Sequence, residues 1–452
     1  MTTGTMLDDS DNVKKPGSLG RQAVGSESVP LKGESFEDTA ANVNEGTFRK
    51  LLQRLTERLS KWGVETEGVA PIPINKRTDT RIYQMFWLWF SANSNVLAFS
   101  TGSAGPAFFG LNLKYSVLIL LVVNILTCAI PAYFVVLGPK LGMRGMVHAR
   151  FSWGLYGAII PSFLNVISTL GSLILNCIIG GQILAAISTK LDYNVGIVIT
   201  SGTSLVVTFF GYRVMHWFES FAWVPAVITF PTLLGLANKH LNPSTMPSLP
   251  TPSASMMLSF ASFVASGVVS WCTITPDYGV YHDHNGSAFK IFLYSYFGFL
   301  LPSVGHIVAW GMMGAAFAAA EPGIPSWKEG YDNGNDLGGL LGSVLSPTGV
   351  IGYWSTSFGT IVLIEHFVFR TSFQSYDIER WDKAELLPPG IAAVIAFLGS
   401  LGIIIPSMQQ TWYTGPIAAS GTGDIGVFTG AAVTVLLYTP LRAIERRIWP
   451  GR

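Results

Sequence analysis

Two long stretches of this sequence are almost free of charged side chains, and they restrict the possible folds more than any other feature. Residues 151–189 contain no charged side chain, and residues 82–138 contain only Lys114. A helix of about 20 residues crosses a hydrocarbon core of about 30 Å, so each stretch is long enough to cross a bilayer at least once. The chain is therefore predicted to be an all-α polytopic membrane protein that lies in a lipid bilayer.

Apolar runs separated by polar breaks predict ten membrane-spanning segments. They lie near 83–109, 116–138, 155–188, 194–211, 218–238, 256–276, 290–320, 340–369, 390–410 and 424–440. Lys and Arg gather in every second loop, as at Arg81 before the first span and at Arg446 after the last. Because basic residues favour the cytoplasmic side of short loops, we expect an even number of crossings and two cytoplasmic termini.

The polar ends of the chain are predicted to flank one transporter-sized membrane domain. Residues 1–80 are expected to form a cytoplasmic tail, largely disordered because its first 45 residues are polar and poor in aromatics. Apolar residues at helical spacing predict a short amphipathic helix at 47–62, which would lie on the inner leaflet or on the protein's own cytoplasmic face. A regulatory partner site is the alternative for this helix. Residues 81–442 would form the transmembrane domain, and residues 443–452 a cytoplasmic tail.

Two spans contain polar, Gly-rich and Pro-rich segments that predict broken helices. In the first span, residues 87–95 are followed by the Gly- and Ser-rich residues 99–106, and in the sixth span residues 265–276 end on Pro276. Freed backbone groups must be satisfied away from lipid, and many secondary transporters bind substrate at such breaks. The alternative is that the small residues only allow helices to approach closely.

Several polar side chains lie at membrane depth and are candidates for a substrate site. Asn176 and Gln182 are on the third span, where amides offer both donors and acceptors to the edge of a neutral heterocycle. Asn165, Ser168, Thr169, Ser172 and Asn176 form one polar stripe on that span. Trp271 lies at the second break, where an indole could stack on a planar ligand. Hydrogen bonding between helices and ordinary packing are the alternatives.

Other functional classes receive little support from the sequence. The net charge of +1 argues against a nucleic-acid partner. The three cysteines fall inside apolar runs, and His282 and His284 lie in a loop, so neither a metal site nor an enzyme is indicated. Asp277 and Glu365 lie near the cytoplasmic ends of spans, where a solvated or Arg-paired carboxylate is one interpretation and proton coupling the other.

Four segments of the chain resemble one transporter family. These are Lys61-Trp-Gly-Val-Glu-Thr-Glu-Gly68, Phe90-Ser-Ala-Asn-Ser-Asn-Val-Leu-Ala-Phe-Ser-Thr-Gly102, Asn176-Cys-Ile-Ile-Gly-Gly-Gln182 and Asp277-Tyr-Gly-Val-Tyr281. They are similar to the fungal purine–cytosine permease branch of the nucleobase–cation symporters. The resemblance runs from about Lys61 to Gly349 and resumes at about Tyr353.

The resemblance implies a twelve-helix protein with a leucine-transporter-like core of five plus five inverted helices and two more. It implies import of adenine, guanine, hypoxanthine or cytosine across the plasma membrane, driven by protons and without another cofactor. It places the nucleobase site on the broken first span, on the amides of the third span and on the sixth span, where Trp271 would stack on the ring. The substrate-binding residues that it implies are Asn93, Ser94, Asn95, Ala98, Asn176, Gln182 and Trp271.

The sequence departs from the family pattern after the seventh span. The segment Ser346-Pro-Thr-Gly-Val-Ile-Gly-Tyr-Trp354 joins the start of an eighth span directly to the expected tenth. About ten spans are therefore expected instead of twelve, with an incomplete second repeat. Ser172 also stands where relatives commonly have Trp, and Ala98 where they often have Ser.

Three functions are compatible with these observations. The first is a proton-coupled purine–cytosine permease. The second is a transporter of another small planar solute, such as a vitamin B6-like compound or a nucleoside. The third is a transport-dead truncated permease that acts as a sensor or partner, because one wall of the site would be missing.

Overall fold

The computed structural model describes residues 68–94, 96–187, 191–209, 217–218, 221–237, 251–302, 337–410 and 412–452. All of them belong to one compact unit, Arg58–Arg452. The amphipathic helix expected at 47–62 and the candidate residue Asn95 lie outside the described residues.

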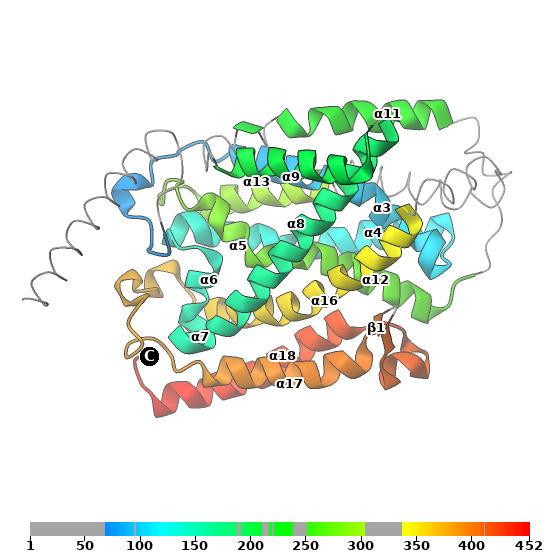
Figure 1. Ribbon diagram of the computed structural model, residues 1–452. Coiled ribbons are helices and arrows are strands. Elements are labelled where there is room, and N and C mark those ends of the chain that lie inside the picture. Colours follow the sequence, from blue (N-terminus) through cyan, green and yellow to red (C-terminus); the bar gives the residue numbers. More distant parts are fainter. Residues whose placement is uncertain are drawn as a thin grey trace, which may run out of the picture. The chain divides into compact units, whose positions relative to one another are not determined.

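Helices occupy each of the ten expected spans, as far as these are described (Figure 1). The α-helices are α2 (Gln84–Asn93), α3 (Val96–Phe109), α4 (Leu113–Thr127), α5 (Ala129–Leu141), α6 (Gly145–His148), α7 (Arg150–Gly157), α8 (Ile159–Ile187), α9 (Tyr193–Phe209), α11 (Val224–Ala237), α12 (Ala254–Val269), α13 (Ala288–Leu301), α16 (Leu337–Ile364), α17 (Ile391–Ser407) and α18 (Gly426–Ile448). Short 3₁₀-helices are η1 (Ile74–Lys76), η2 (Ser270–Thr273), η3 (Thr275–Gly279), η7 (Phe373–Ser375) and η8 (Ile378–Arg380), and π-helical turns are η6 (Glu365–Arg370) and η9 (Ala418–Thr422). Strands β1 (Gln409–Gln410) and β2 (Tyr413–Thr414) form an antiparallel hairpin between α17 and α18.

Four helical segments of the described residues are long and apolar enough to cross a membrane. They are Leu113–Leu141, Ile159–Ala185, Ala254–Thr273 and Gly426–Ile448. Shorter apolar helices cover Tyr193–Phe209, Ala288–Leu301 and Ile391–Ser407. The long apolar runs therefore form membrane-type helices, as the sequence predicts.

The first predicted break is present but shorter than expected. Helix α2 ends at Asn93, Ser94 leaves the helical conformation with φ −89° and ψ 71°, and α3 begins at Val96. The expectation that residues 99–106 extend this break is wrong, because they are helical within α3. A Cβ on Gly105 would lie 2.6 Å from Oγ of Ser116 on α4. The small residue there allows close helix packing, which is the alternative function of such residues.

The second predicted break is confirmed. Helix α12 ends at Val269, and the chain continues through η2 and η3 to Gly279. These turns pack directly on α5, where a Cβ on Gly138 would collide with the carbonyl oxygen of Pro276. Pro276 cannot donate the backbone hydrogen bond that a continuous helix needs. Because Gly138 has no Cβ, the broken segment can pack closely against α5.

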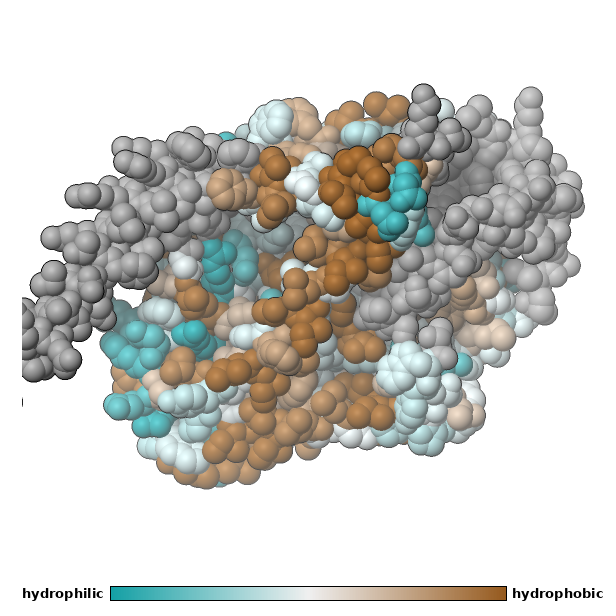
Figure 2. Space-filling view, viewed as in Figure 1, coloured by the Kyte–Doolittle hydropathy of each residue, from teal (hydrophilic) through white to brown (hydrophobic). Residues whose placement is uncertain are grey.

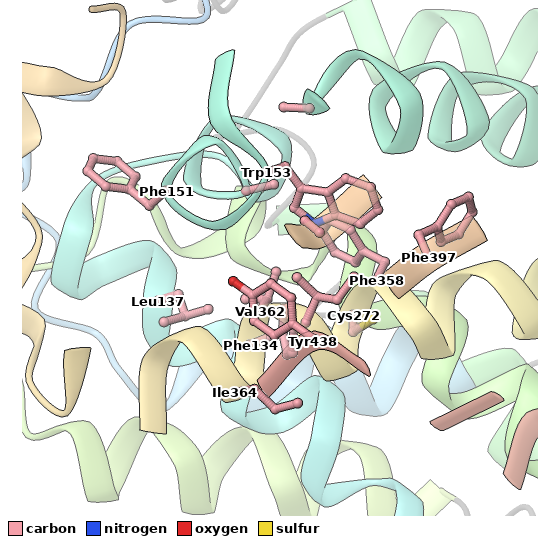
Figure 3. Packing of buried hydrophobic residues seen from close by; sticks show 14 of the residues in the cluster. Phe134, Leu137, Phe151, Trp153, Cys272, Phe358, Val362, Ile364, Phe397 and Tyr438 are labelled. Carbon is pink, nitrogen blue, oxygen red and sulfur yellow. The ribbon is translucent and has the colours of Figure 1, made fainter. Parts of the chain in front are cut away.

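Helix α16 lies between two groups of helices, with α5 and α12 on one side and α17 and α18 on the other (Figure 1). The main apolar core forms around it. Figure 3 shows Phe358 of α16 together with Trp153, Cys272, Phe397 and Tyr438, which come from four other elements. The helix therefore connects the broken sixth span to the C-terminal helix pair.

Helices α8 and α9 lie against each other with their backbones in close contact. A Cβ on Gly180 would lie 2.5 Å from the Thr200 side chain, and one on Gly196 would lie 2.7 Å from the Gly181 carbonyl oxygen. Helix α8 crosses the other helices obliquely (Figure 1), and hydrophobic residues cover its outer surface (Figure 2). Such a surface suits contact with lipid.

Ordered structure continues into both segments that flank the predicted membrane domain. Before the first span, the Ile72 amide donates to the Gly142 carbonyl oxygen at 2.8 Å, and the buried Arg77 donates through Nε to the Ile72 carbonyl oxygen at 2.8 Å. Part of the segment expected as a tail thus packs on the domain. At the other end, α18 continues to Ile448, beyond the expected end of the domain at residue 442.

Candidate functional site

The second helix break contacts a buried tryptophan on α2, the helix that leads into the first break. Trp89 of α2 is 1% exposed. Its ring lies edge-on to Trp271 of η2, with centroids 5.8 Å apart, and it stacks on Phe299 of α13 at 4.7 Å. Tyr278 of η3, in the same broken segment, contacts the Trp89 indole at 5.2 Å. Trp89 was not predicted from the sequence, where it is one of two tryptophans in an apolar run with no motif to distinguish it.

The candidate residues at the first break follow Trp89 closely in the sequence. Asn93 donates through Nδ2 to the Trp89 carbonyl oxygen at 2.8 Å. Ser91 and Ser94 are buried, and their hydroxyls have no hydrogen-bond partner among the described residues. Buried polar groups are normally hydrogen-bonded, so these hydroxyls are available to a polar ligand. Ala98 lies in α3, and its side chain is outside the described set.

Trp271 has a position suited to its predicted contact with a planar ring. Its side chain is half-buried, and it makes T-shaped contacts with two aromatic neighbours, Trp89 at 5.8 Å and Phe299 at 6.3 Å. The structure therefore places Trp271 against Trp89, whose carbonyl oxygen accepts from Asn93, and Ser94 follows Asn93 at the end of α2. Their contact with substrate stays a prediction.

The predicted amides of α8 have a different environment. Asn176 is exposed and donates through Nδ2 to the Ser172 carbonyl oxygen of its own helix at 2.8 Å. The Oε1 atom of Gln182 is buried and has no hydrogen-bond partner within the described part of the chain. Neither amide has a hydrogen bond to the breaks among the described residues, and their predicted role in the site stays a prediction.

The junction expected at Ser346–Trp354 lies inside the continuous backbone of α16. Within this junction, a Cβ on Gly352 would overlap the Ser266 side chain of α12. Trp354 donates through Nε1 to Oγ of Ser168 on α8 at 3.0 Å. The joined helix therefore contacts both the broken sixth span and the third span.

The two carboxylates singled out from the sequence have structural partners. Glu365 is buried and accepts hydrogen bonds from Arg442 Nε at 2.9 Å, from Arg370 Nε at 3.1 Å and from Tyr438 at 2.8 Å. The Arg-paired interpretation is thus confirmed for Glu365. Asp277 accepts the Gly145 amide at 2.7 Å.

A buried carboxylate that the sequence analysis did not single out is Asp424. It lies between β2 and α18 and is 5% exposed. No other charged residue occurs between Ile391 and Pro440. This isolation is a sequence signal that could have identified it.

Two titratable side chains, one on α6 and one in the segment before α2, have shifted pKa values. Burial, followed by the nearby His366 and Arg370, lowers the pKa of His148 to about 3. Burial raises the pKa of Asp79, but hydrogen bonds from Arg81 outweigh it, and the net pKa is lowered. Within the described residues, no group of three His, Cys, Asp or Glu side chains could hold a metal ion.

A pocket of about 1010 Å³ lies beside the first turn of α2. Its aromatic lining includes Trp87 and Trp223, which stack with centroids 5.5 Å apart, and its polar lining includes Gln84 and Arg81. The Oε1 atom of Gln84 has no hydrogen-bond partner in the described part of the structure. The pocket lies at the opposite end of α2 from the break.

Comparison with known proteins shows several similarities. Residues 71–357 match the family model described as permease for cytosine/purines, uracil, thiamine, allantoin. The purine-cytosine permease FCY21 of Saccharomyces cerevisiae is 28% identical, with 92% of this chain and 93% of the relative covered. The vitamin B6 transporter TPN1 of the same organism is 23% identical over 90% of this chain and 92% of its own.

The fold is that of Mhp1, a nucleobase-cation-symport-1 family transporter solved with bromovinylhydantoin bound. The TM-score is 0.61 at 15% identity, with 86% of this chain and 97% of Mhp1 covered. The matches to FCY21 and TPN1 extend over 499 and 541 residues, more than the 452 residues of this chain. Both relatives therefore contain residues with no counterpart here.

The family match covers more than half of the chain, and the fold, the two broken helices and the fungal permease relatives agree with it. These relatives are transporters, as the sequence analysis expects, and not enzymes. The chain belongs to the family of permeases for cytosine/purines, uracil, thiamine and allantoin.

Proposed function

We propose that this protein imports purine bases and cytosine by proton symport across the plasma membrane. The observation that carries the proposal is the contact between Trp271 at the second break and Trp89 on the helix that leads into the first break, within a permease family. An aromatic cluster next to buried, unused hydroxyls suits a flat heterocycle with polar edges, because the ring can stack while its edge is hydrogen-bonded. Adenine, guanine, hypoxanthine and cytosine all have this chemistry.

The distribution of basic side chains supports an orientation with both termini in the cytoplasm. Basic side chains gather at one end of the helices, where Arg370 donates to the Phe151 carbonyl oxygen at 3.1 Å and Arg150 donates to the Trp381 carbonyl oxygen at 3.2 Å. The C-terminus lies at this end, beside α6 and α7 (Figure 1). Positive residues favour the cytoplasmic face. In this orientation the pocket beside Trp87 opens near the cytoplasm and gives a released base an aromatic surface on its way out.

Uptake in cells that lack their own permeases tests the proposal. We expect labelled adenine or cytosine to accumulate, to do so without sodium, and to stop doing so after addition of a protonophore. Accumulation that requires sodium would contradict proton symport. Absence of both uptake and binding for all four bases would contradict the substrate class.

Two other functions have specific support. The similarity to TPN1 favours a vitamin B6-like solute, and inhibition of base uptake by excess pyridoxine would reveal it. The residues that the relatives have and this chain lacks favour a transport-dead permease. Saturable base binding by purified protein without uptake into proteoliposomes would identify that case.

A further inference from the structure

Asp424 is the only charged residue in a large part of the protein. Between Ile391 and Pro440 there is no other Asp, Glu, Lys, Arg or His, and α12 and α16, which pack beside Asp424, contain none. Of the elements around it, α16 contributes the titratable Tyr353 and β2 contributes Tyr413, whereas the first titratable residue of α18 is Tyr438 and its charged residues begin at Arg442, toward the other end of that helix. The carboxylate is therefore buried without a cationic partner on any of these elements.

Hydrogen-bond donors surround both oxygens of this carboxylate. Oδ2 accepts from the Tyr353 hydroxyl, from the Gln409 amide at 3.0 Å and from Gln410 Nε2 at 3.3 Å. Oδ1 accepts from Ser262 Oγ at 3.2 Å and from the Gly426 amide at 3.0 Å. All five contacts are donations to the carboxylate oxygens, and none of them requires a proton on Asp424.

A proton on Asp424 would change this arrangement. A protonated carboxyl carries a hydrogen on one oxygen, so at least one of the donors there must turn away or become an acceptor. A backbone amide cannot accept, whereas the Tyr353 hydroxyl can. Protonation would therefore reorganise the contact between Asp424 and α16 first and would weaken the attachment of the Gln409–Asp424 segment.

Helix α12 connects the contacts of Asp424 to the candidate site. Ser262, which donates to Asp424, is one helical turn from Ser266 on the same face. Ser266 is the residue that contacts Gly352 of α16, and it lies four residues before the second break. A change in the Asp424 contacts thus acts on the two helices that meet beside this break.

We propose that Asp424 is the proton-binding site of this transporter. Ionised, it holds α12, α16 and the hairpin together at the end of the protein opposite the Arg-rich loops; protonated, it releases them. In the orientation proposed above this end faces outside, where the coupling proton enters. The inference rests on the proposed function, and it adds the residue at which the proton binds.

Transport by the purified protein in liposomes tests this inference, with D424N and D424E as variants. Occupancy of a single proton site falls about tenfold per pH unit above its midpoint, so wild-type uptake should fall about tenfold per unit in that range. D424N should exchange base across the membrane but not accumulate it, and its rate should vary by less than about twofold over the same pH range. D424E should restore the pH dependence. D377N is the matched control, because Asp377 is exposed.

Amide hydrogen exchange at Gln409 and Gly426 gives a readout that needs no substrate. After correction for the intrinsic exchange rate, wild type should lose protection of both amides on acidification, and D424N should show the same protection at each pH. If the wild type transports with protons and D424N keeps the wild-type pH profile, the site is refuted while the proposed function stands. If the wild type transports nothing but shows the pH-dependent exchange that D424N lacks, the function fails and the proton site stands. Exchange that is independent of pH in the wild type would overturn the site.

Discussion

Replacing Arg442 with Met should destabilise the protein more than any other single change of a charged residue that we consider. Arg442 is 1% exposed. It donates through Nε and Nη2 to the two oxygens of Glu365 at 2.9 and 3.0 Å, and through Nη1 to Glu445 at 3.1 Å. One guanidinium thus compensates two buried carboxylates at the Arg-rich end of α16 and α18. Methionine has a similar length and keeps the packing but removes the charge.

The expected loss of stability follows from the hydrogen-bond partners that Glu365 and Glu445 retain in R442M. Among the described residues, Glu365 without Arg442 retains Arg370 and the Tyr438 hydroxyl, whereas Glu445 retains only the backbone amides of Ile391 and Ala392, at 2.9 and 3.4 Å. Removing one partner of a buried ion pair costs about 3–5 kcal/mol. At about 2 °C per kcal/mol for a chain of this size, the melting temperature should fall by about 6–10 °C.

Thermal melting of R442M in detergent, followed by intrinsic fluorescence, measures this effect. The matched control is R380M, because Arg380 pairs with Asp377 at 2.7 Å but both side chains are more than a third exposed. Exposed pairs contribute about 0–1 kcal/mol, so R380M should melt close to wild type. Removing the charge of Glu445 together with that of Arg442, as in R442M/E445Q, should recover part of the loss, because Glu445 is the carboxylate that is left without a cation. If R442M and R380M melt at the same temperature, the buried network does not stabilise the protein as argued.

Three further predictions concern packing, pH and substrate. Gly138→Ala should lower the melting temperature and surface expression, because overpacking costs about 1–3 kcal/mol; Gly267→Ala on α12, which has open space, should not. Between an unfolded-state pKa of about 6.5 and the folded-state pKa of about 3 for His148, stability should fall as pH decreases, and H148F should flatten that part of a melting-temperature profile. Trp271→Ala should raise the KM for base uptake about 5- to 150-fold, since base–aromatic stacking is worth about 1–3 kcal/mol; Trp412→Ala is the exposed control, and equal effects would contradict stacking.

The spans could be predicted from the sequence because burial in lipid demands long apolar runs, and these are visible without knowledge of the fold. The breaks were only partly predictable. At Pro276 the residue itself removes a helical hydrogen bond, so the local sequence decides the outcome. In residues 99–106 the Gly and Ser residues stay helical, because Gly105 packs against Ser116 of another helix. Small residues can either break a helix or allow two helices to pack closely, and the outcome depends on a neighbouring helix that is distant in the sequence.

The candidate site was predictable to a similar degree. Trp271 could be selected because it adjoins a break, but Trp89 could not, since its importance comes from contacts with residues about 180 and 210 positions away in the chain. Asp424 has no motif, and its five donors come from four separate segments. Conversely, the stripe on α8 has helical periodicity, but periodicity does not specify which neighbour a face meets.

The exposed stripe on α8 and the extra residues of the relatives lead to a last prediction. Asn176 and Thr169 donate to carbonyl oxygens of their own helix, at 2.8 Å each, so much of their polarity is satisfied without a neighbouring helix. A missing eighth span therefore affects the folding of α8 less than it affects the wall of the substrate site. Inserting the corresponding segment of FCY21 between Gly349 and Tyr353 should then tighten base binding to the purified protein while leaving the melting temperature nearly unchanged. An insertion of equal length with its polar residues replaced by Leu controls for helix packing alone. A higher melting temperature without tighter binding would show that the missing segment serves stability, contrary to this reasoning.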